Sequence, residues 1–328
     1  MPELKNERYK RIAVEEGFSI PEVSRLRFRE YEGSAPTPMR QKVFQNLLDL
    51  GEGRIKAMDE DGIAMQVCVF AGAVIQDIDP VQGNELAALA NDRLAEAAKK
   101  YPGRITGLAA YAPRDPERAA RELERSVKKL GLKGGIVNSH SNGEYYDDAK
   151  YWPIFEAMEA MGKPIYIHPR DPSPQMVAPF QVTGFKIGWS WAAEVGTHII
   201  RLIGNGVFDR FPNLKIVIGH MGEGIPFHLD RIDNRYFWEH DMAGTAPKLK
   251  RKPSDYFRDN VAVTTSGMNF GAPLKMTIEM IGIDNVLFAA DWPFEDARAS
   301  VDAVDALALS DADMQKLYHL NSERVFAL

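Results

Sequence analysis

Eight short apolar runs recur along the chain, and residues spaced as in amphipathic helices lie between most of them. The runs are almost unbroken by polar residues, which is typical of parallel strands that are buried on both faces. We expect strands at residues 12–15, 65–71, 105–111, 134–138, 164–168, 215–219, 261–264 and 286–290. Eight strands that alternate with helices favour a closed (β/α)8 barrel of the TIM type over a doubly wound sheet. The sequence therefore predicts an α/β fold with residues 1–328 in a single barrel domain.

The segments between the runs carry helix signals. Asp115-Pro116-Glu117 is an acidic start with proline in the first turn, and Gly131 is placed to cap the end of that helix. The expected helices are 84–100, 115–130, 151–161, 191–205, 225–235, 274–281, 297–307 and 311–325. Residues 19–39, 169–189 and 237–254 form unusually long connections. The first two follow strands one and five, so we expect loop insertions on the catalytic face that either wall a site or contact a neighbouring subunit.

Composition excludes several classes of partner. The 328 residues are 45% hydrophobic and 26% charged, with a formal net charge of -6, so a nucleic-acid partner is not expected. The short basic run 248–252 is typical of a solvated loop. No apolar stretch is long enough to cross a bilayer, and the charged N-terminus lacks an apolar signal region. Cys68 is the only cysteine, so an internal disulfide is excluded and a cytoplasmic location is expected.

Three of the expected strands end in residues that can bind a metal. Glu15 ends the first strand, His168 ends the fifth, and Asp291 follows the eighth. All strands of a (β/α)8 barrel end on one face, where active sites lie, so these side chains would converge although they are far apart in sequence. Two carboxylates and one imidazole suit a divalent cation with open coordination positions, with Mn²⁺ or Zn²⁺ favoured and Mg²⁺ possible. The alternative is an ordinary strand-end carboxylate at Glu15 and a helix cap at Asp291.

The sixth strand also ends in usable side chains. His220 follows this strand, Glu223 lies in the next loop, and Arg231 lies further along the helical stretch. His220 can serve as a metal ligand, a general acid or base, or a substrate donor. Glu223 and Arg231 either face the mouth of the barrel or form a surface ion pair.

Aromatic residues follow the expected ligands and are candidates for a substrate pocket. Phe18, Trp292 and Phe294 come shortly after Glu15 and Asp291. Trp191, in Trp189-Ser190-Trp191, either walls the same pocket or packs in the core or a subunit interface.

Four motifs together resemble the amidohydrolase-related, metal-dependent decarboxylases, and most of all the hydroxybenzoate decarboxylases of the γ-resorcylate and 2,3-dihydroxybenzoate types. The motifs, in the order of strands one, five, six and eight, are Glu15-Glu16-Gly17-Phe18, Ile167-His168-Pro169, Gly219-His220-Met221-Gly222-Glu223 and Ala290-Asp291-Trp292-Pro293. The resemblance extends from about Arg11 to the C-terminus.

This resemblance implies an amidohydrolase-like barrel with one divalent metal ion and no organic cofactor. It implies that Glu15, His168 and Asp291 bind the metal and that His220 and Glu223 form a polar dyad beside it. It places Arg231 near the substrate, where it would orient the acidic end of this network. A homodimer or a homotetramer is expected on the same grounds.

One position departs from the pattern of the family. Many members have Glu-x-His at the end of strand one, whereas this chain has Gly17 in place of the histidine. Some related decarboxylases also have a small residue there, so the change removes one ligand and leaves the other metal ligands in place. Hydrolytic relatives usually keep a His-x-His pair, so Gly17 weakens the case for hydrolysis.

The reaction implied is the non-oxidative decarboxylation of a small aromatic acid with an ortho hydroxyl group. The metal would chelate the phenol and carboxylate oxygens, and Asp291 would protonate the ring carbon, with a pKa raised by desolvation. His220 and Glu223 would relay or orient the proton. The cycle is reversible in principle, so the sequence leaves open the direction and the other ring substituents.

Two further hypotheses come from other classes of function. The first is a metal-dependent hydrolase or hydratase that acts on a lactone or a ring-cleavage product, with metal-bound water as its nucleophile. Product analysis separates it from a decarboxylase, which releases CO₂. The second is a catalytically silent barrel that serves as a binding module, which the set of carboxylate and imidazole groups argues against.

Overall fold

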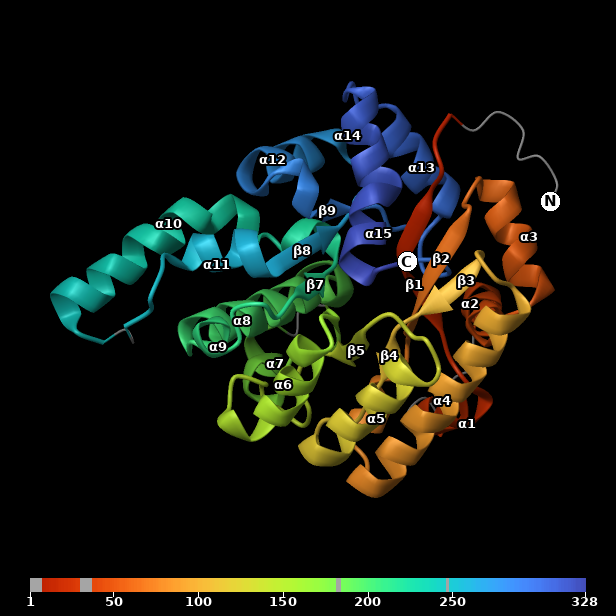
Figure 1. Ribbon diagram of the computed structural model, residues 1–328, viewed down its shortest axis with the longest axis horizontal. Coiled ribbons are helices and arrows are strands. Elements are labelled where there is room, and N and C mark those ends of the chain that lie inside the picture. The colour runs from red at the N-terminus through yellow and green to blue at the C-terminus, as the bar shows by residue number, and fades with distance from the viewer. Residues whose placement is uncertain (1–7, 30–36, 181–183, 246–247) are drawn as a thin grey trace.

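The strands are all parallel and follow one another in sequence order (Figure 1). This computed structural model describes residues 8–29, 37–180, 184–245 and 248–328. The strands form one sheet in the order β1-β2-β3 and another in the order β4-β5-β6-β7-β8-β9. Their bounds are β1 (Ile12–Phe18), β2 (Met65–Phe70), β3 (Ile105–Gly107), β4 (Ala109–Ala110), β5 (Gly135–Asn138), β6 (Ile165–His168), β7 (Ile216–Ile218), β8 (Val261–Thr264) and β9 (Val286–Leu287).

Backbone hydrogen bonds connect these two sheets at both of their junctions. β3 and β4 are separated only by Leu108, whose N–H donates to Cys68 O at 2.9 Å. On the other side, Val14 N–H in β1 donates to Phe288 O, just after β9, at 3.0 Å. Counting β3 and β4 as one interrupted strand gives the eight positions of the (β/α)8 fold, so the predicted fold class is confirmed.

The helices alternate with the strands, as the sequence predicts. Their bounds are α1 (Pro21–Arg29), α2 (Pro38–Leu48), α3 (Glu52–Asp61), α4 (Pro80–Lys100), α5 (Pro116–Lys128), α6 (Trp152–Ala160), α7 (Pro174–Phe180), α8 (Trp191–Gly204), α9 (Val207–Arg210), α10 (Ile225–Trp238), α11 (Pro253–Asn260), α12 (Gly271–Ile281), α13 (Ala297–Asp305), α14 (Asp311–Gln315) and α15 (Asn321–Phe326). Short 3-10 or π-helical turns are η1 (Ala73–Gln76), η2 (Ala149–Tyr151), η3 (Lys186–Ser190), η4 (His220–Gly222), η5 (Glu239–Ala243), η6 (Ile283–Asn285) and η7 (Lys316–Leu320).

Helix starts follow the expected chemistry. The Asp115 side chain accepts the N–H of Arg118, and Pro116 occupies the first turn of α5. The expected closing helix at 311–325 consists of α14, η7 and α15 in direct succession. Among the described residues, no helix has both the length and the apolar character needed to span a membrane.

Several strand bounds differ from the predicted ranges, and two of these differences concern the candidate site residues. β1 continues to Phe18 instead of ending at Glu15, and its pairing with β2 shifts register between Val14 and Glu16. Glu15 therefore lies in a bulge within the strand, with φ 83°, and not at the strand end. β9 is shorter than predicted and ends at Leu287, although residues 288–290 remain buried.

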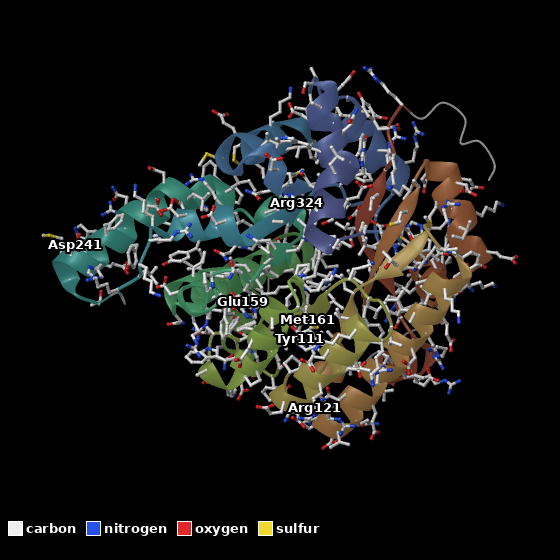
Figure 2. All side chains as sticks on the ribbon, viewed as in Figure 1. Tyr111, Arg121, Glu159, Met161, Asp241 and Arg324 are labelled. Atoms are coloured by element: carbon white, nitrogen blue, oxygen red, sulfur yellow. The ribbon has the colours of Figure 1, made fainter. Side chains whose placement is uncertain are left out.

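The three long connections contain secondary structure of their own. Residues 19–39 include α1 and the start of α2, and residues 169–189 include α7, while positions 30–36 and 181–183 lie outside the described residues. The third connection begins within α10, which extends to Trp238 and projects beyond the rest of the barrel (Figure 1). Asp241 lies at the far end of this projection, whereas the buried Tyr111 lies near the middle of the molecule (Figure 2).

Candidate metal centre and active site

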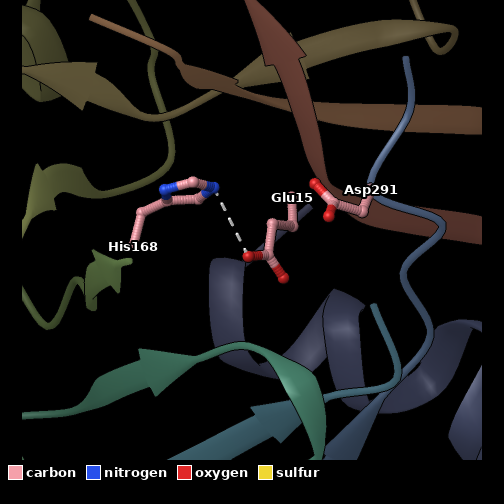
Figure 3. A group of neighbouring side chains, drawn as sticks. All are labelled: Glu15, His168 and Asp291. Carbon is pink, nitrogen blue, oxygen red and sulfur yellow. Dashed lines mark ion pairs between the residues drawn. The ribbon is translucent and has the colours of Figure 1, made fainter. Parts of the chain in front are cut away.

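The three side chains predicted to bind a metal lie together at the carboxyl ends of the strands (Figure 3). Glu15 comes from the bulge in β1, His168 is the last residue of β6, and Asp291 follows β9. One potential ligand atom from each residue lies within 4.8 Å of the others. The barrel thus brings together residues that are more than a hundred positions apart, as the sequence predicts.

The two oxygens of Glu15 have different surroundings. Oε2 accepts hydrogen bonds from Thr264 Oγ1, at 2.8 Å, and from Ser266 Oγ. Oε1 is buried, finds no hydrogen-bond partner among the described residues, and lies 3.7 Å from His168 Nε2. A buried acceptor without a partner is costly, and a bound cation would remove that cost. The observed arrangement of Glu15 therefore fits a metal ligand.

Gly219, which follows β7, leaves room for the Glu15 carboxylate. A Cβ atom at Gly219 would lie 2.7 Å from Glu15 Oε1 and 2.9 Å from Glu15 Oε2. Any larger residue at this position would displace Glu15 from the cluster.

His168 is fixed in the form that can bind a metal. Its Nδ1 lies 2.8 Å from Pro169 O, and a carbonyl oxygen can only accept, so Nδ1 carries the proton. Nε2 is therefore the ring nitrogen that can bind a metal, and it lies 3.7 Å from Glu15 Oε1. Metal-binding histidines are commonly oriented in this way, by a backbone carbonyl that accepts from the other ring nitrogen.

Asp291 adopts a left-handed backbone conformation, with φ 61°. Burial raises the pKa of its carboxyl, and the nearby negative charge of Glu15 raises it further, while the neighbouring imidazole of His220 opposes the shift. The pKa remains above the ordinary value. This is the environment that the sequence-based hypothesis requires of a proton donor.

His220 connects Asp291 to a second carboxylate. Its Nδ1 lies 2.8 Å from Glu223 Oε1, and its Nε2 lies 3.7 Å from Asp291 Oδ2. Burial lowers the pKa of His220, but the carboxylates of Glu223, Glu15 and Asp291 outweigh burial and raise it well above the ordinary value. The predicted dyad of His220 and Glu223 therefore forms, and it carries a proton beside Asp291.

The turn that carries this dyad has an unusual backbone. His220, Met221 and Glu223 all have positive φ angles, of 51°, 56° and 54°. Ser266 Oγ accepts the N–H of His220 at 3.2 Å and also bonds Glu15. Ser266 thus ties the dyad to the candidate metal ligands.

The structure does not bring Arg231 to this cluster. Arg231 is exposed on α10, and within the part of the chain that is described it forms no ion pair with Glu223. Neither the predicted orienting contact nor the surface ion pair between these two residues is observed. Its role toward a substrate remains a prediction.

The four aromatic pocket candidates divide into two pairs. Phe18 is fully buried against Phe70, and Trp292 is buried beneath the Arg54 guanidinium. Phe294 is 38% exposed, and Trp191 is partly buried with its indole N–H donating to Asp171 Oδ1 at 2.9 Å. Phe294 and Trp191 are therefore the better candidates for contact with a substrate.

Three residues at this site were not among those predicted from the sequence. Thr264 and Ser266 hold Glu15, and Glu16 accepts backbone N–H groups on both sides of Asp291. The run of hydroxyl residues 264–266 at the end of the seventh expected strand was the available signal for the first two.

Comparison with known proteins gives consistent matches. A model of the family described as Amidohydrolase matches residues 44–328. The γ-resorcylate decarboxylase of Polaromonas sp. (strain JS666 / ATCC BAA-500) is 39% identical over 97% of this chain and 98% of its own length.

Two solved structures extend these similarities to the fold. The 5-carboxyvanillate decarboxylase LigW from Sphingomonas paucimobilis has a TM-score of 0.92 and 38% identity, over 97% of this chain and 99% of that chain. The dihydroxybenzoic acid decarboxylase from Polaromonas sp. JS666, solved with manganese and the inhibitor 2-nitroresorcinol, has a TM-score of 0.89 and 39% identity, over 98% and 97% of the two chains. Each similarity spans nearly the whole of both chains.

Proposed function

Because this chain belongs to the amidohydrolase family, we propose that it is a metal-dependent carboxy-lyase that removes CO₂ from an aromatic acid with an ortho hydroxyl group. The observation that carries the proposal is the convergence of Glu15, His168 and Asp291, with Glu15 Oε1 buried and unpaired among the described residues. The names of the relatives support this reaction class, since they are decarboxylases of hydroxylated benzoates.

Glu15, His168 and Asp291 would hold one divalent cation. When bound, the cation would act as a Lewis acid and template for the phenol and carboxylate oxygens of the substrate. Manganese in a solved relative supports Mn²⁺, and a site with two carboxylates and one imidazole also accommodates Zn²⁺ or Mg²⁺. The reaction needs no organic cofactor, because the substrate itself accepts the proton and keeps the electron pair.

Asp291 is the proposed proton donor. It delivers a proton to the ring carbon that bears the carboxylate, which interrupts the aromatic ring. The carbon–carbon bond then breaks, its electron pair returns to the ring, and CO₂ leaves. A carboxyl with a raised pKa is suited to hold and deliver such a proton.

His220 is the proposed source from which Asp291 regains its proton. Its Nε2 lies 3.7 Å from Asp291 Oδ2, while Glu223 holds the opposite side of the ring through Nδ1. The side chain of His220 is 24% exposed, so it can exchange protons with solvent. In the reverse direction the same groups would accept the proton that carboxylation releases.

The hydrolase alternative finds less support. It would favour a second histidine at position 17, where a Cβ atom would lie 3.0 Å from Leu47 Cδ2 and 3.1 Å from Phe294 Cε2. An imidazole at this position requires both neighbours to move. Gly17 therefore fits a site that uses fewer imidazole ligands.

We also propose a homodimer or homotetramer, with residues 1–328 as one domain. Large apolar side chains that are more than half exposed gather on α10 and η5 and on the segment 185–189, and such surfaces often mark subunit contacts. They are Phe227, Trp238, Met242, Phe185, Ile187 and Trp189. Light scattering on the purified protein tests the oligomeric state. A cytoplasmic location stays part of the proposal, and the single cysteine agrees with it.

The experiment that tests the proposed function is CO₂ release from a panel of hydroxybenzoates. Protein stripped of metal is assayed before and after addition of Mn²⁺, with each ortho-hydroxy acid paired with its para isomer. We expect metal-dependent CO₂ release from an ortho-hydroxy acid and none from the para isomer. Absence of CO₂ from every acid, with metal confirmed bound, would overturn the proposal.

A further inference from the structure

Glu16 is a fully buried carboxylate that the proposed reaction does not use. It follows Glu15 in the bulge of β1, where the pairing with β2 shifts register. Glu15 faces the metal cluster, and Glu16 contacts the turn formed by residues 290–292. The bulge therefore sends two neighbouring carboxylates to two different parts of the same site.

Both oxygens of Glu16 bind the turn that contains Asp291. Oε1 accepts the N–H of Ala290 at 3.0 Å, and Oε2 accepts the N–H of Trp292 at 3.3 Å. The next residue adds a third connection, because Gly17 N–H donates to Trp292 O at 2.6 Å. Asp291 thus lies between two backbone N–H groups that one carboxylate holds.

A buried arginine fixes the orientation of Glu16 through Gln66. Gln66 Nε2 donates to Glu16 Oε2 at 3.3 Å, and Gln66 Oε1 accepts from Arg54 Nη1 at 2.9 Å. Arg54 also donates to Gly17 O, and its guanidinium carbon lies 4.4 Å from the centre of the Trp292 ring. The positive charge of Arg54 partly offsets the cost of burying Glu16.

All three polar neighbours of Glu16 are hydrogen-bond donors. Arg54 holds the amide of Gln66 with its oxygen turned away from Glu16, so the amide cannot reverse without losing that bond. A side chain with an NH₂ group in place of one Glu16 oxygen would therefore face a donor at either position.

We infer that Glu16 is a positioning residue that holds Asp291 in its left-handed conformation, directed at the metal and the substrate ring carbon. The inference rests on the proposed function, in which Asp291 has both roles. A left-handed conformation is strained for aspartate, so the turn would relax if its two N–H groups lost their common acceptor. A displacement of about 1 Å at a reacting group can cost on the order of 100-fold in rate.

The test is Glu16→Gln, which preserves size and replaces one acceptor with a donor. We expect the Mn²⁺ dissociation constant to rise, and kcat to fall, by on the order of 10-fold or more, with KM changed by less than about 3-fold. Mn²⁺ affinity is measured by electron paramagnetic resonance of the free ion, which needs no turnover. A folded variant with wild-type Mn²⁺ affinity and kcat would overturn the inference.

A matched control separates positioning from a general loss of stability. Glu194 is also fully buried and accepts a backbone N–H, from Ser173, but none of its described hydrogen bonds involves residues 290–292. We expect Glu194→Gln to lower Tm while the Mn²⁺ affinity stays unchanged. If Glu194→Gln weakens Mn²⁺ binding as much as Glu16→Gln does, the effect is not specific to the turn and the inference fails.

A second variant keeps the inference testable if Glu16→Gln does not fold. Gln66→Met removes the amide that orients Glu16, so both the Mn²⁺ affinity and kcat should fall several-fold. Unchanged values in folded Gln66→Met would overturn the inference. If the wild-type protein releases no CO₂ but Glu16→Gln still weakens Mn²⁺ binding, the proposed reaction fails while the positioning role of Glu16 toward the metal stands.

Discussion

Two buried clusters in this barrel contain a histidine and a carboxylate, and they differ in how completely they are hydrogen-bonded. In the cluster beside α8, Ser139 Oγ lies 3.2 Å from both His198 Nδ1 and Glu194 Oε1. Glu194 Oε2 accepts the N–H of Ser173 at 2.9 Å, and His198 Nε2 accepts the N–H of Tyr146 at 3.2 Å. Every polar atom of the His198 and Glu194 side chains thus has a partner.

The cluster of Glu15, His168 and Asp291 differs in two respects. Glu15 Oε1 has no partner among the described residues, and the side chains of His168 and Asp291 are each 13% exposed. Residue type therefore does not separate a site from a structural network, since both clusters contain an imidazole and a carboxylate. What separates them is a buried acceptor without a hydrogen-bond partner, at Glu15, beside two partly exposed side chains, His168 and Asp291.

The sharpest test of this contrast is Asp291→Asn, which we expect to have the largest effect. The amide cannot deliver a proton, so kcat should fall by on the order of 100-fold or more. The measurement is CO₂ release with saturating Mn²⁺. Near-normal turnover in this variant would remove Asp291 from the role of proton donor.

Substituting the histidine of each cluster in turn tests the contrast through the amount of bound Mn²⁺. We expect His168→Ala to lose bound Mn²⁺, with affinity reduced by on the order of 100-fold, because it removes a ligand atom. His198→Gln should retain full Mn²⁺ content. Metal is counted by elemental analysis of the dialysed proteins, and equal metal content in the two variants would contradict the distinction.

A smaller effect is expected from the hydroxyl that holds Glu15. Thr264→Val removes one donor to Glu15 Oε2 and keeps the shape of the side chain, so Mn²⁺ affinity should fall by roughly 10-fold. The matched control is Thr277→Val, at a buried threonine on α12 whose hydroxyl has no partner among the described residues. Titration with Mn²⁺ compares the two, and an equal response would show that the bond to Glu15 is not what matters.

The smallest effect concerns stability and pH at the hydrogen-bonded cluster. Burial lowers the pKa of His198 to about 3, below its ordinary value near 6.5. Above that ordinary value His198 is neutral in both states and adds no pH dependence. As pH falls from about 6.5 towards 3, only the unfolded chain takes up the proton, so stability falls by up to about 1.4 kcal/mol per pH unit.

Urea unfolding between pH 5.5 and 7.5 measures how much His198 changes the free energy of unfolding, because the loss of stability begins in this pH range. We expect the wild-type protein to lose about 1 kcal/mol more than His198→Gln as the pH falls from 7.5 to 5.5. Parallel pH profiles for the two proteins would mean that His198 is not held neutral.

The sequence predicts most of the barrel because parallel strands buried on both faces leave a simple pattern. It places His168 correctly at a strand end, and it places Asp291 after the last strand, although β9 ends at Leu287 and not directly before Asp291.

The bulge in β1 could not be predicted from the sequence. Glu15 and Glu16 are chemically identical, and an unbroken run gives no sign of where the pairing with β2 shifts. Glu15 faces the metal cluster through contacts with Thr264 and Ser266, and Glu16 contacts the turn at 290–292. All of these partners are distant in sequence. Arg231 failed to join the cluster for a related reason, because the expected helix does not specify which face turns inward.

The left-handed backbone at the site has a consequence for engineering this protein. Glu15, His220, Glu223 and Asp291 all have positive φ angles, a conformation that glycine adopts freely and other residues adopt at a cost of roughly 1–2 kcal/mol. Glycine at any of these positions would relieve that strain and delete a side chain that the proposed reaction needs. A library selected only for heat resistance would therefore tend to accumulate inactive proteins, and a turnover assay has to accompany every round of such selection.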